Sequence, residues 1–213
     1  MGLIGLFGVA AAMWIVGGVW VLLRRAGHPP AGAAGAALAA GQPLDPTDAD
    51  LPWQRWLVRT SDGLDLPVWD IAGDGAAATA VLVHDWGEAP LTMIGRALEL
   101  SATTRRILIP CLRGHDGAAG ACSLGPREAD DLARLLETID CDDVRLEGSG
   151  LGGFIVESAR EASPVSHVRS VEPWDSQSDG LRRILAASGF PAFPIATVAG
   201  LAARCTSADT SSS

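Results

Sequence analysis

The sequence predicts an α/β fold, a mostly parallel sheet with flanking helices, that follows a single transmembrane helix at the N-terminus. The chain opens on a long apolar run, and a stretch rich in Ala, Gly and Pro comes next. From Trp53 onward, short apolar runs alternate with longer helix-like stretches. This alternation is typical of strands joined by crossover helices. A chain of 213 residues has room for one membrane segment and one modest domain.

The N-terminal run, residues 2–23, is uncharged and long enough to cross the hydrocarbon layer of a bilayer. Arg24 and Arg25 follow at once, and the positive-inside tendency then predicts that the domain faces the cytoplasm. We therefore expect a transmembrane anchor over residues 1–25, and a single-pass protein whose partner is the membrane. A cleaved signal peptide, with cleavage in the small-residue tract 31–41, is the alternative.

The rest of the chain divides into four expected parts. Residues 26–50 are rich in Ala, Gly and Pro and predict a flexible linker. The core of the domain is expected over residues 51–175, and cap-like helices over residues 176–205. The Ser-rich end, residues 206–213, predicts a disordered tail.

The core is expected to begin with a β-hairpin, because residues 56–59 and 66–71 flank the turn sequence Ser61-Asp62-Gly63. After the hairpin, bounded apolar runs predict buried strands at residues 80–84, 106–110, 143–146 and 168–171. Helical periodicity predicts the intervening helices at residues 91–100, 126–138 and 151–162.

Charge and cysteine content exclude several kinds of partner. The formal net charge of −9 at pH 7 repels a phosphate backbone, which argues against a nucleic acid partner. The four cysteines form no C-x-x-C pair and have no histidine at zinc-ligand spacing. We therefore expect no metal site and no cofactor.

Three segments, in order, resemble motifs of the α/β-hydrolase superfamily, which includes esterases and lipases. The first follows the predicted third strand and reads His84-Asp85-Trp86-Gly87. The second is the loop Arg113-Gly114-His115-Asp116-Gly117, followed by a helix with Asp130 and Asp131, a pair that we interpret as a solvated face. The third is the strand-to-helix turn Gly148-Ser149-Gly150-Leu151-Gly152-Gly153, which is similar to the nucleophile elbow G-x-S-x-G.

The resemblance implies a role for each of these segments. The backbone amides of Trp86 and Leu151 would form the oxyanion hole. The residues that shape the pocket loops would be His84, Asp85, Arg113 and His115. In the elbow, the positions at which the turn needs small residues are Gly148, Gly152 and Gly153.

The elbow departs from the family pattern at its reactive position. Aligning the other glycines places Gly150 where the nucleophile belongs, and Ser149 just before it. His167, the last histidine, precedes the predicted sixth strand, and the seventh and eighth strands of the family, which carry the acid and the base, have no counterpart. We expect an inactive protein, or a fragment of a serine hydrolase truncated after the sixth strand. Its open sheet edge invites self-association.

Other functions remain open at this point. An active hydrolase would use Ser149 to attack an ester, thioester or amide. A dinucleotide-binding protein would use residues 148–153, which also satisfy G-x-G-x-x-G. A non-enzymatic module would bind a partner or an acyl-type small molecule in the remnant pocket.

Overall fold

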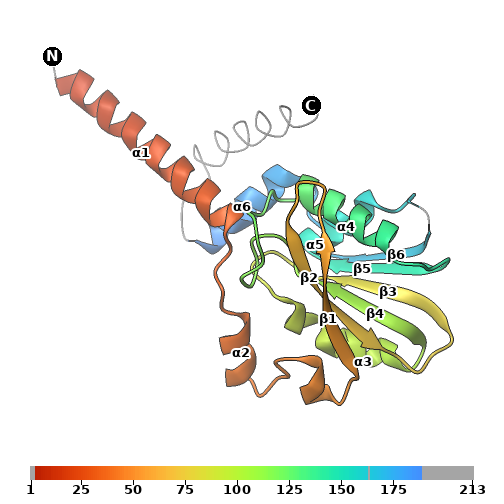
Figure 1. The fold of residues 1–213 in the computed structure, drawn as a ribbon. Helices are drawn as coiled ribbons and strands as arrows, with labels where there is room; N and C mark the ends of the chain where they lie inside the picture. Colours follow the sequence, from red (N-terminus) through yellow and green to blue (C-terminus); the bar gives the residue numbers. More distant parts are fainter. Residues whose placement is uncertain (1–2, 163, 189–213) are drawn as a thin grey trace. The chain divides into compact units, whose positions relative to one another are not determined.

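The computed structural model describes residues 3–162 and 164–188, and the chain divides into two compact units. The first unit consists of residues 1–27 and 175–213, and its described helices are α1 (Leu3–Gly27) and α6 (Gln177–Ala187). The second unit, residues 28–174, contains the sheet (Figure 1). The predicted second cap-like helix and the predicted tail lie in residues 189–213, outside the described residues.

The expected membrane anchor is wrong. Within residues 3–162 and 164–188, no helix has the length and apolar character that crossing a membrane requires. Residues 3–23 of the predicted span fall in α1, whose side chains Trp14 and Val21 line a groove of about 270 Å³ together with Leu185 of α6. Of the described apolar residues of α1, Leu22 and Ala26 are buried, whereas Met13, Val16 and Trp20 are exposed. The single-pass topology, which depended on this anchor, is wrong as well.

The sheet of the second unit has six strands in the order β1-β2-β4-β3-β5-β6. The strands are β1 (Trp53–Arg59), β2 (Asp65–Ala72), β3 (Ala77–Val83), β4 (Thr104–Pro110), β5 (Val144–Ser149) and β6 (Val165–Val171). β2 pairs antiparallel with both β1 and β4, and the pairs β3 with β4, β3 with β5, and β5 with β6 are parallel. The predicted hairpin and the mostly parallel sheet are therefore confirmed.

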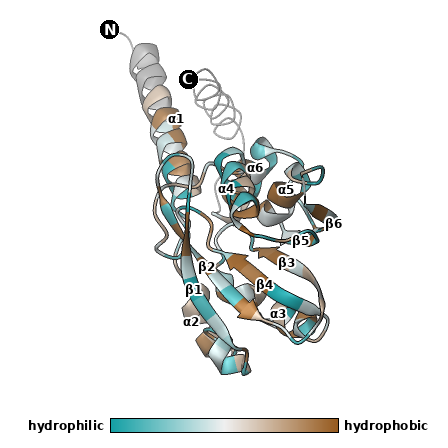
Figure 2. Cartoon of the chain, turned by 45° about the vertical axis from the view of Figure 1, so that its right-hand side comes forward, coloured by the Kyte–Doolittle hydropathy of each residue, from teal (hydrophilic) through white to brown (hydrophobic). Residues whose placement is uncertain are grey.

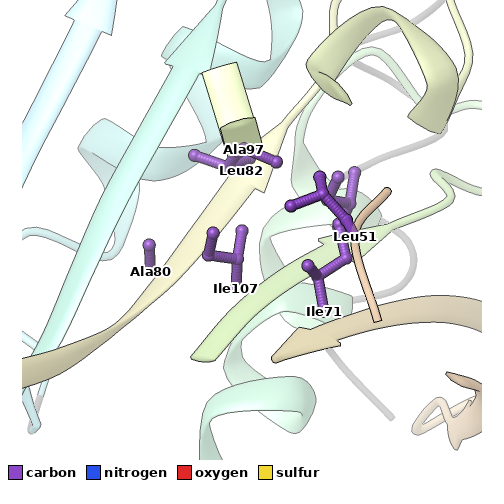
Figure 3. Close-up of a cluster of buried hydrophobic side chains, with 7 residues drawn as sticks. Leu51, Ile71, Ala80, Leu82, Ala97 and Ile107 are labelled. Carbon is purple, nitrogen blue, oxygen red and sulfur yellow. The ribbon is translucent and has the colours of Figure 1, made fainter. Parts of the chain in front are cut away.

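Helices cover both faces of this sheet, which explains why its central strands are apolar on both sides (Figures 1 and 2). The helices are α2 (Ala33–Ala39), η1 (Pro46–Ala49), η2 (Pro90–Met93), α3 (Ile94–Ser101), α4 (Pro126–Thr138) and α5 (Leu151–Ser158). In β3, Val81, Leu82 and Val83 have no exposed surface. The α3 face holds a buried cluster to which Leu82, Ile107 and Ala97 belong (Figure 3).

Two predicted segments differ from the structure. The expected linker, residues 26–50, contains α2 and η1, and η1 begins where the Thr47 amide donates a hydrogen bond to Asp45 Oδ1 at 2.7 Å. Asp45 is thus an N-cap residue, which the Ala-, Gly- and Pro-rich composition of this stretch did not predict. The helix expected over residues 91–100 begins with a 3-10 turn at Pro90, because proline is accommodated in a first turn.

Candidate functional site

The candidate site lies at the turn between β5 and α5, in the second unit. β5 ends at Ser149 and α5 begins at Leu151, so Gly150 alone makes the turn. Its φ of 51°, with a ψ of −113°, is positive, a backbone conformation that glycine tolerates and other residues rarely adopt. The sharp backbone turn of a nucleophile elbow is therefore centred on Gly150, one residue after the serine.

Two neighbouring glycines let the strand and the helix approach closely. A Cβ atom at Gly148 would lie 2.4 Å from the carbonyl group of Gly152. A Cβ atom at Gly152 would lie 2.2 Å from the carbonyl oxygen of Val83. Gly153 is less constrained, since its nearest contact would be 3.1 Å away, at Pro173. The spacing of Gly148, Gly150 and Gly152 thus matches the packing of a hydrolase elbow.

The carboxylate of Asp85 is bound by two backbone amides at this turn. The Leu151 amide donates a hydrogen bond to Asp85 Oδ1 at 2.6 Å, and the Trp86 amide donates to the same oxygen at 2.6 Å. These are the two amides that the sequence resemblance singled out. They converge on one oxygen, as an oxyanion hole requires, and the oxygen belongs to the protein itself.

The same carboxylate fills the space that a side chain at position 150 would need. A Cβ atom at Gly150 would lie 2.0 Å from the carboxyl carbon and both carboxyl oxygens of Asp85. No side chain fits at position 150 while Asp85 keeps this position. A dinucleotide would need the N-terminus of α5 for its pyrophosphate, and there it would meet a group of the same charge.

Ser149 lies on a different face from the elbow. Side chains alternate along a strand, and Gly148 faces α5. Ser149 therefore shares the opposite face with Glu147, whose carboxylate binds Arg96 of α3 at 2.7 Å. None of the hydrogen bonds found among the described residues joins the Ser149 hydroxyl to a histidine. The hydrogen bonds of the described residues thus give the predicted alternative nucleophile no histidine that could act as its base.

Both loop histidines are buried, and their hydrogen bonds fix their orientation. His84 Nδ1–H donates to the Asp85 carbonyl at 2.9 Å, and the Leu112 amide donates to His84 Nε2 at 3.2 Å. Burial and the nearby ring of His115 lower the pKa of His84 to about 3. His115 Nδ1–H donates to the Arg113 carbonyl at 3.0 Å, and burial lowers the pKa of His115 as well. Neutral at pH 7, these rings hold the loops in place.

Arg113 is a structural ion-pair centre. Its side chain is 1% exposed, and its guanidinium binds Asp131 of α4 through two hydrogen bonds of 2.6 and 2.7 Å. It also binds Asp62, in the turn of the hairpin, at 2.8 Å. This pairing, with Arg113 as the largest cause, lowers the pKa of Asp62 to about 2. Interpreting Asp131 as part of a solvated helix face was wrong, since the residue is 6% exposed.

Sequence reasoning missed Glu128, which fixes the start of α4. The residue has no exposed surface, and its carboxylate accepts hydrogen bonds from the amides of Ser123 and Gly125, both at 2.7 Å. A signal was present: Glu128, Asp131 and Leu135 are spaced three and four residues apart and so share the buried face of a helix.

Two small cavities flank these loops, and each has a volume of about 10 Å³. His115 and Glu88 line the first with residues 29–33, and Leu112 and Asp131 are among the residues that line the second. A volume of this size holds about one water molecule. Among the described residues, no group of three His, Cys, Asp or Glu side chains is placed to hold a metal ion.

Solved structures of esterases share this fold. An esterase from Pyrococcus furiosus matches with a TM-score of 0.60 and 16% identity over 81% of this chain, and this chain spans 66% of the length of that esterase. An esterase from Exiguobacterium antarcticum matches with a TM-score of 0.51 and 17% identity, over 57% of this chain and 46% of that one.

The comparisons by sequence found nothing. No model of a protein family matches the chain. No curated protein matches it either. The likeness therefore rests on structure, and it shows that the second unit has an α/β-hydrolase-like fold.

Proposed function

We propose that this protein is a non-catalytic α/β-hydrolase-like module whose oxyanion position is occupied by its own Asp85. The observation that carries the proposal is the contact of one carboxylate oxygen with two amides, those of Trp86 and Leu151, at 2.6 Å each. A substrate carbonyl would have to displace this carboxylate before its oxygen could reach the amides.

Displacement of the carboxylate is unfavourable. A hydrogen bond to a charged group contributes roughly 1.5 to 3 kcal/mol, and Asp85 Oδ1 accepts two of them. An oxyanion that formed nearby would also be repelled by the negative charge of Asp85. Electrostatic stabilisation of a developing charge, the main contribution of this turn in a working hydrolase, is thus unfavourable here.

No serine hydrogen-bonded to a histidine is found at the turn among the described residues, which also supports the proposal. Gly150 has no side chain, and Ser149 faces the Glu147 side of the sheet. Of the histidines near the turn, His84 uses both ring nitrogens in hydrogen bonds, and His115 is 1% exposed. Without a base, a serine hydroxyl stays protonated and is a weak nucleophile at neutral pH.

A module without catalysis is expected to act by binding. The acyl-type ligand that the resemblance implies would have to open the site, because the two cavities beside it each hold about one water molecule. Binding of such a ligand is therefore less well supported than the absence of catalysis.

Labelling of the full chain with a fluorophosphonate probe tests the proposal. The variants are Ser149→Ala, Asp85→Ala and Asp140→Ala. Asp140→Ala is the matched control, since it removes the same charge from an exposed position. Circular dichroism confirms that each variant is folded, and a working serine esterase verifies the probe.

We expect no labelling above the Ser149→Ala background in the wild type or in Asp85→Ala. Labelling of the wild type that Ser149→Ala abolishes would contradict the proposal and identify an active hydrolase. Labelling that appears only when Asp85 is removed would also contradict it, and would identify a hydrolase blocked by its own carboxylate.

A further inference from the structure

β6 is an edge strand. Among the described residues, Val165–Val171 pair with β5 on one side and with no strand on the other. An unpaired row of backbone amide and carbonyl groups is a template for another chain. What that chain is can be argued from the backbone and from the sequence of β6 itself.

The direction of the free backbone groups follows from one hydrogen bond. The Gly150 amide donates to the Val171 carbonyl at 3.0 Å, so the backbone groups of Val171 point toward β5. In a strand, the backbone groups of successive residues point to opposite sides. The backbone groups of Arg169 therefore also point toward β5. Those of Val168 and Ser170 point toward the open edge.

The sequence of β6 is self-complementary. It reads Val165-Ser166-His167-Val168-Arg169-Ser170-Val171, nearly the same in both directions about Val168. If two copies pair antiparallel about this centre, Val168 lies opposite itself, Ser166 opposite Ser170, and Val165 opposite Val171. The one unlike pair is His167 with Arg169.

The direction of the outward backbone groups and the self-complementary sequence of β6 favour the same register. A hydrogen-bonded antiparallel pair needs outward backbone groups on both residues, and Val168 supplies them at the centre. An isologous twofold interface requires each patch to match itself, which the sequence of β6 does. We propose that a second copy of this chain adds to the sheet at β6, antiparallel, with the two Val168 residues facing each other across the twofold axis.

Two features that blunt an edge strand are present in β6, and both are compatible with this pairing. The register with β5 shifts between Val144 and Arg145, which shortens the regular part of the ladder at its Ser166 end. Arg169 carries a charge, but its guanidinium lies 3.2 Å from the carboxylate of Glu147 in the same chain. The Val171 side chain, 45% exposed, gains an apolar neighbour when it faces Val165 of the second copy.

The interface is small, because each strand contributes seven residues. It falls below the size of a standard stable interface, so a dimer with a dissociation constant on the order of micromolar is expected. The inference is independent of the proposed function, since β6 pairs with the strand before the elbow and no catalytic step involves it.

Cysteine cross-linking of the full chain tests the register. Residues that face each other in a hydrogen-bonded antiparallel pair have Cα atoms about 5.5 Å apart, within reach of a disulfide. The Val168→Cys variant should therefore form a covalent dimer under mild oxidation with copper phenanthroline. The Val171→Cys variant is the matched control, because two residues at position 171 would lie about 20 Å apart, six residues along the antiparallel pair.

Analytical ultracentrifugation supplies a second readout. The Val168→Pro variant lacks the outward amide, and proline is tolerated on an edge strand. Dimer should be lost in Val168→Pro while circular dichroism stays unchanged. At His167, which faces Arg169 of the second copy, glutamate should tighten the dimer and lysine should weaken it, each by roughly 2- to 30-fold for two pairs.

The expected result is a cross-linked dimer for Val168→Cys, none above the wild type for Val171→Cys, and a monomer for Val168→Pro. A wild type that stays monomeric at 100 µM or more, about a hundredfold above the expected dissociation constant, would overturn the inference. So would a dimer that persists in Val168→Pro, which would locate the contact elsewhere, for example on α1. Equal cross-linking at positions 168 and 171 would refute the register.

Discussion

The Arg113 loop and the Gly150 turn resemble the same superfamily, yet they differ in what each turn contains. In the loop, Arg113 has both of its acidic partners, Asp131 and Asp62, within 2.8 Å. At the turn, the backbone bends sharply at Gly150, which has no side chain, and the carboxylate of Asp85 accepts a hydrogen bond from the Leu151 amide. The comparison teaches that one fold can hold a fully paired ion cluster in one loop and, at another turn, a carboxylate bound by backbone amides.

The largest expected change in the free energy of unfolding comes from a substitution in the Arg113 loop. Replacing Arg113 by methionine leaves the buried carboxylate of Asp131 without a cation, which should lower the free energy of unfolding by about 3 to 5 kcal/mol. Urea denaturation measures the change. The matched control is Arg127→Met: this side chain is 51% exposed and lies 3.6 Å from Asp62, so its loss should cost less than about 1 kcal/mol. Equal losses in both variants would remove the distinction between the two arginines.

A smaller effect is expected at the turn. Gly150→Ala places a Cβ atom where the Asp85 carboxylate lies, so the free energy of unfolding should fall by about 1 to 3 kcal/mol. In the Asp85→Ala background, the same change should cost less, since only the strain of the positive φ remains. Additive losses in this double-mutant cycle would mean that position 150 and Asp85 do not touch.

The smallest effect concerns the dependence of stability on pH. Burial holds the pKa of His84 at about 3 in the folded chain, whereas an unfolded histidine titrates near 6.5. Between these values, the unfolded state binds the extra proton, so stability should fall as the pH drops below 6.5. The slope should approach about 1.4 kcal/mol per pH unit for this one group.

Urea denaturation at pH 7.5, 6.5 and 5.5 checks this slope. It should flatten in His84→Gln and remain in His167→Gln, because His167 is exposed. A slope that His84→Gln leaves unchanged would assign the pH dependence to other groups.

Local patterns in the sequence predicted much of the fold. The helix over residues 126–138 is α4 to the residue, and the hairpin and the parallel strands follow from apolar runs bounded by turn residues. The membrane prediction was made from an apolar run alone, and no helix among the described residues has the length and apolar character of a membrane span. The linker was predicted from composition, which does not reveal that Asp45 caps a short 3-10 helix in this stretch.

The site was predictable in its backbone and not in its side chains. The family motif was enough to pick out Trp86 and Leu151 as neighbouring amides. No sequence pattern predicts that the carboxylate of Asp85, 66 residues before Leu151 in the chain, binds both amides. That contact depends on the tertiary arrangement of β3 and β5. The same holds for Arg113 and Asp62, which are 51 residues apart.

The most direct test of the central claim is the proton chemical shift of two backbone amides. Short hydrogen bonds to a carboxylate oxygen should move the amide protons of Trp86 and Leu151 far downfield in the wild type. Both should return upfield in Asp85→Ala and stay in place in Asp140→Ala. Amide proton shifts at Trp86 and Leu151 that stay unchanged in Asp85→Ala would contradict the account. The two amides would then not be bound to this carboxylate.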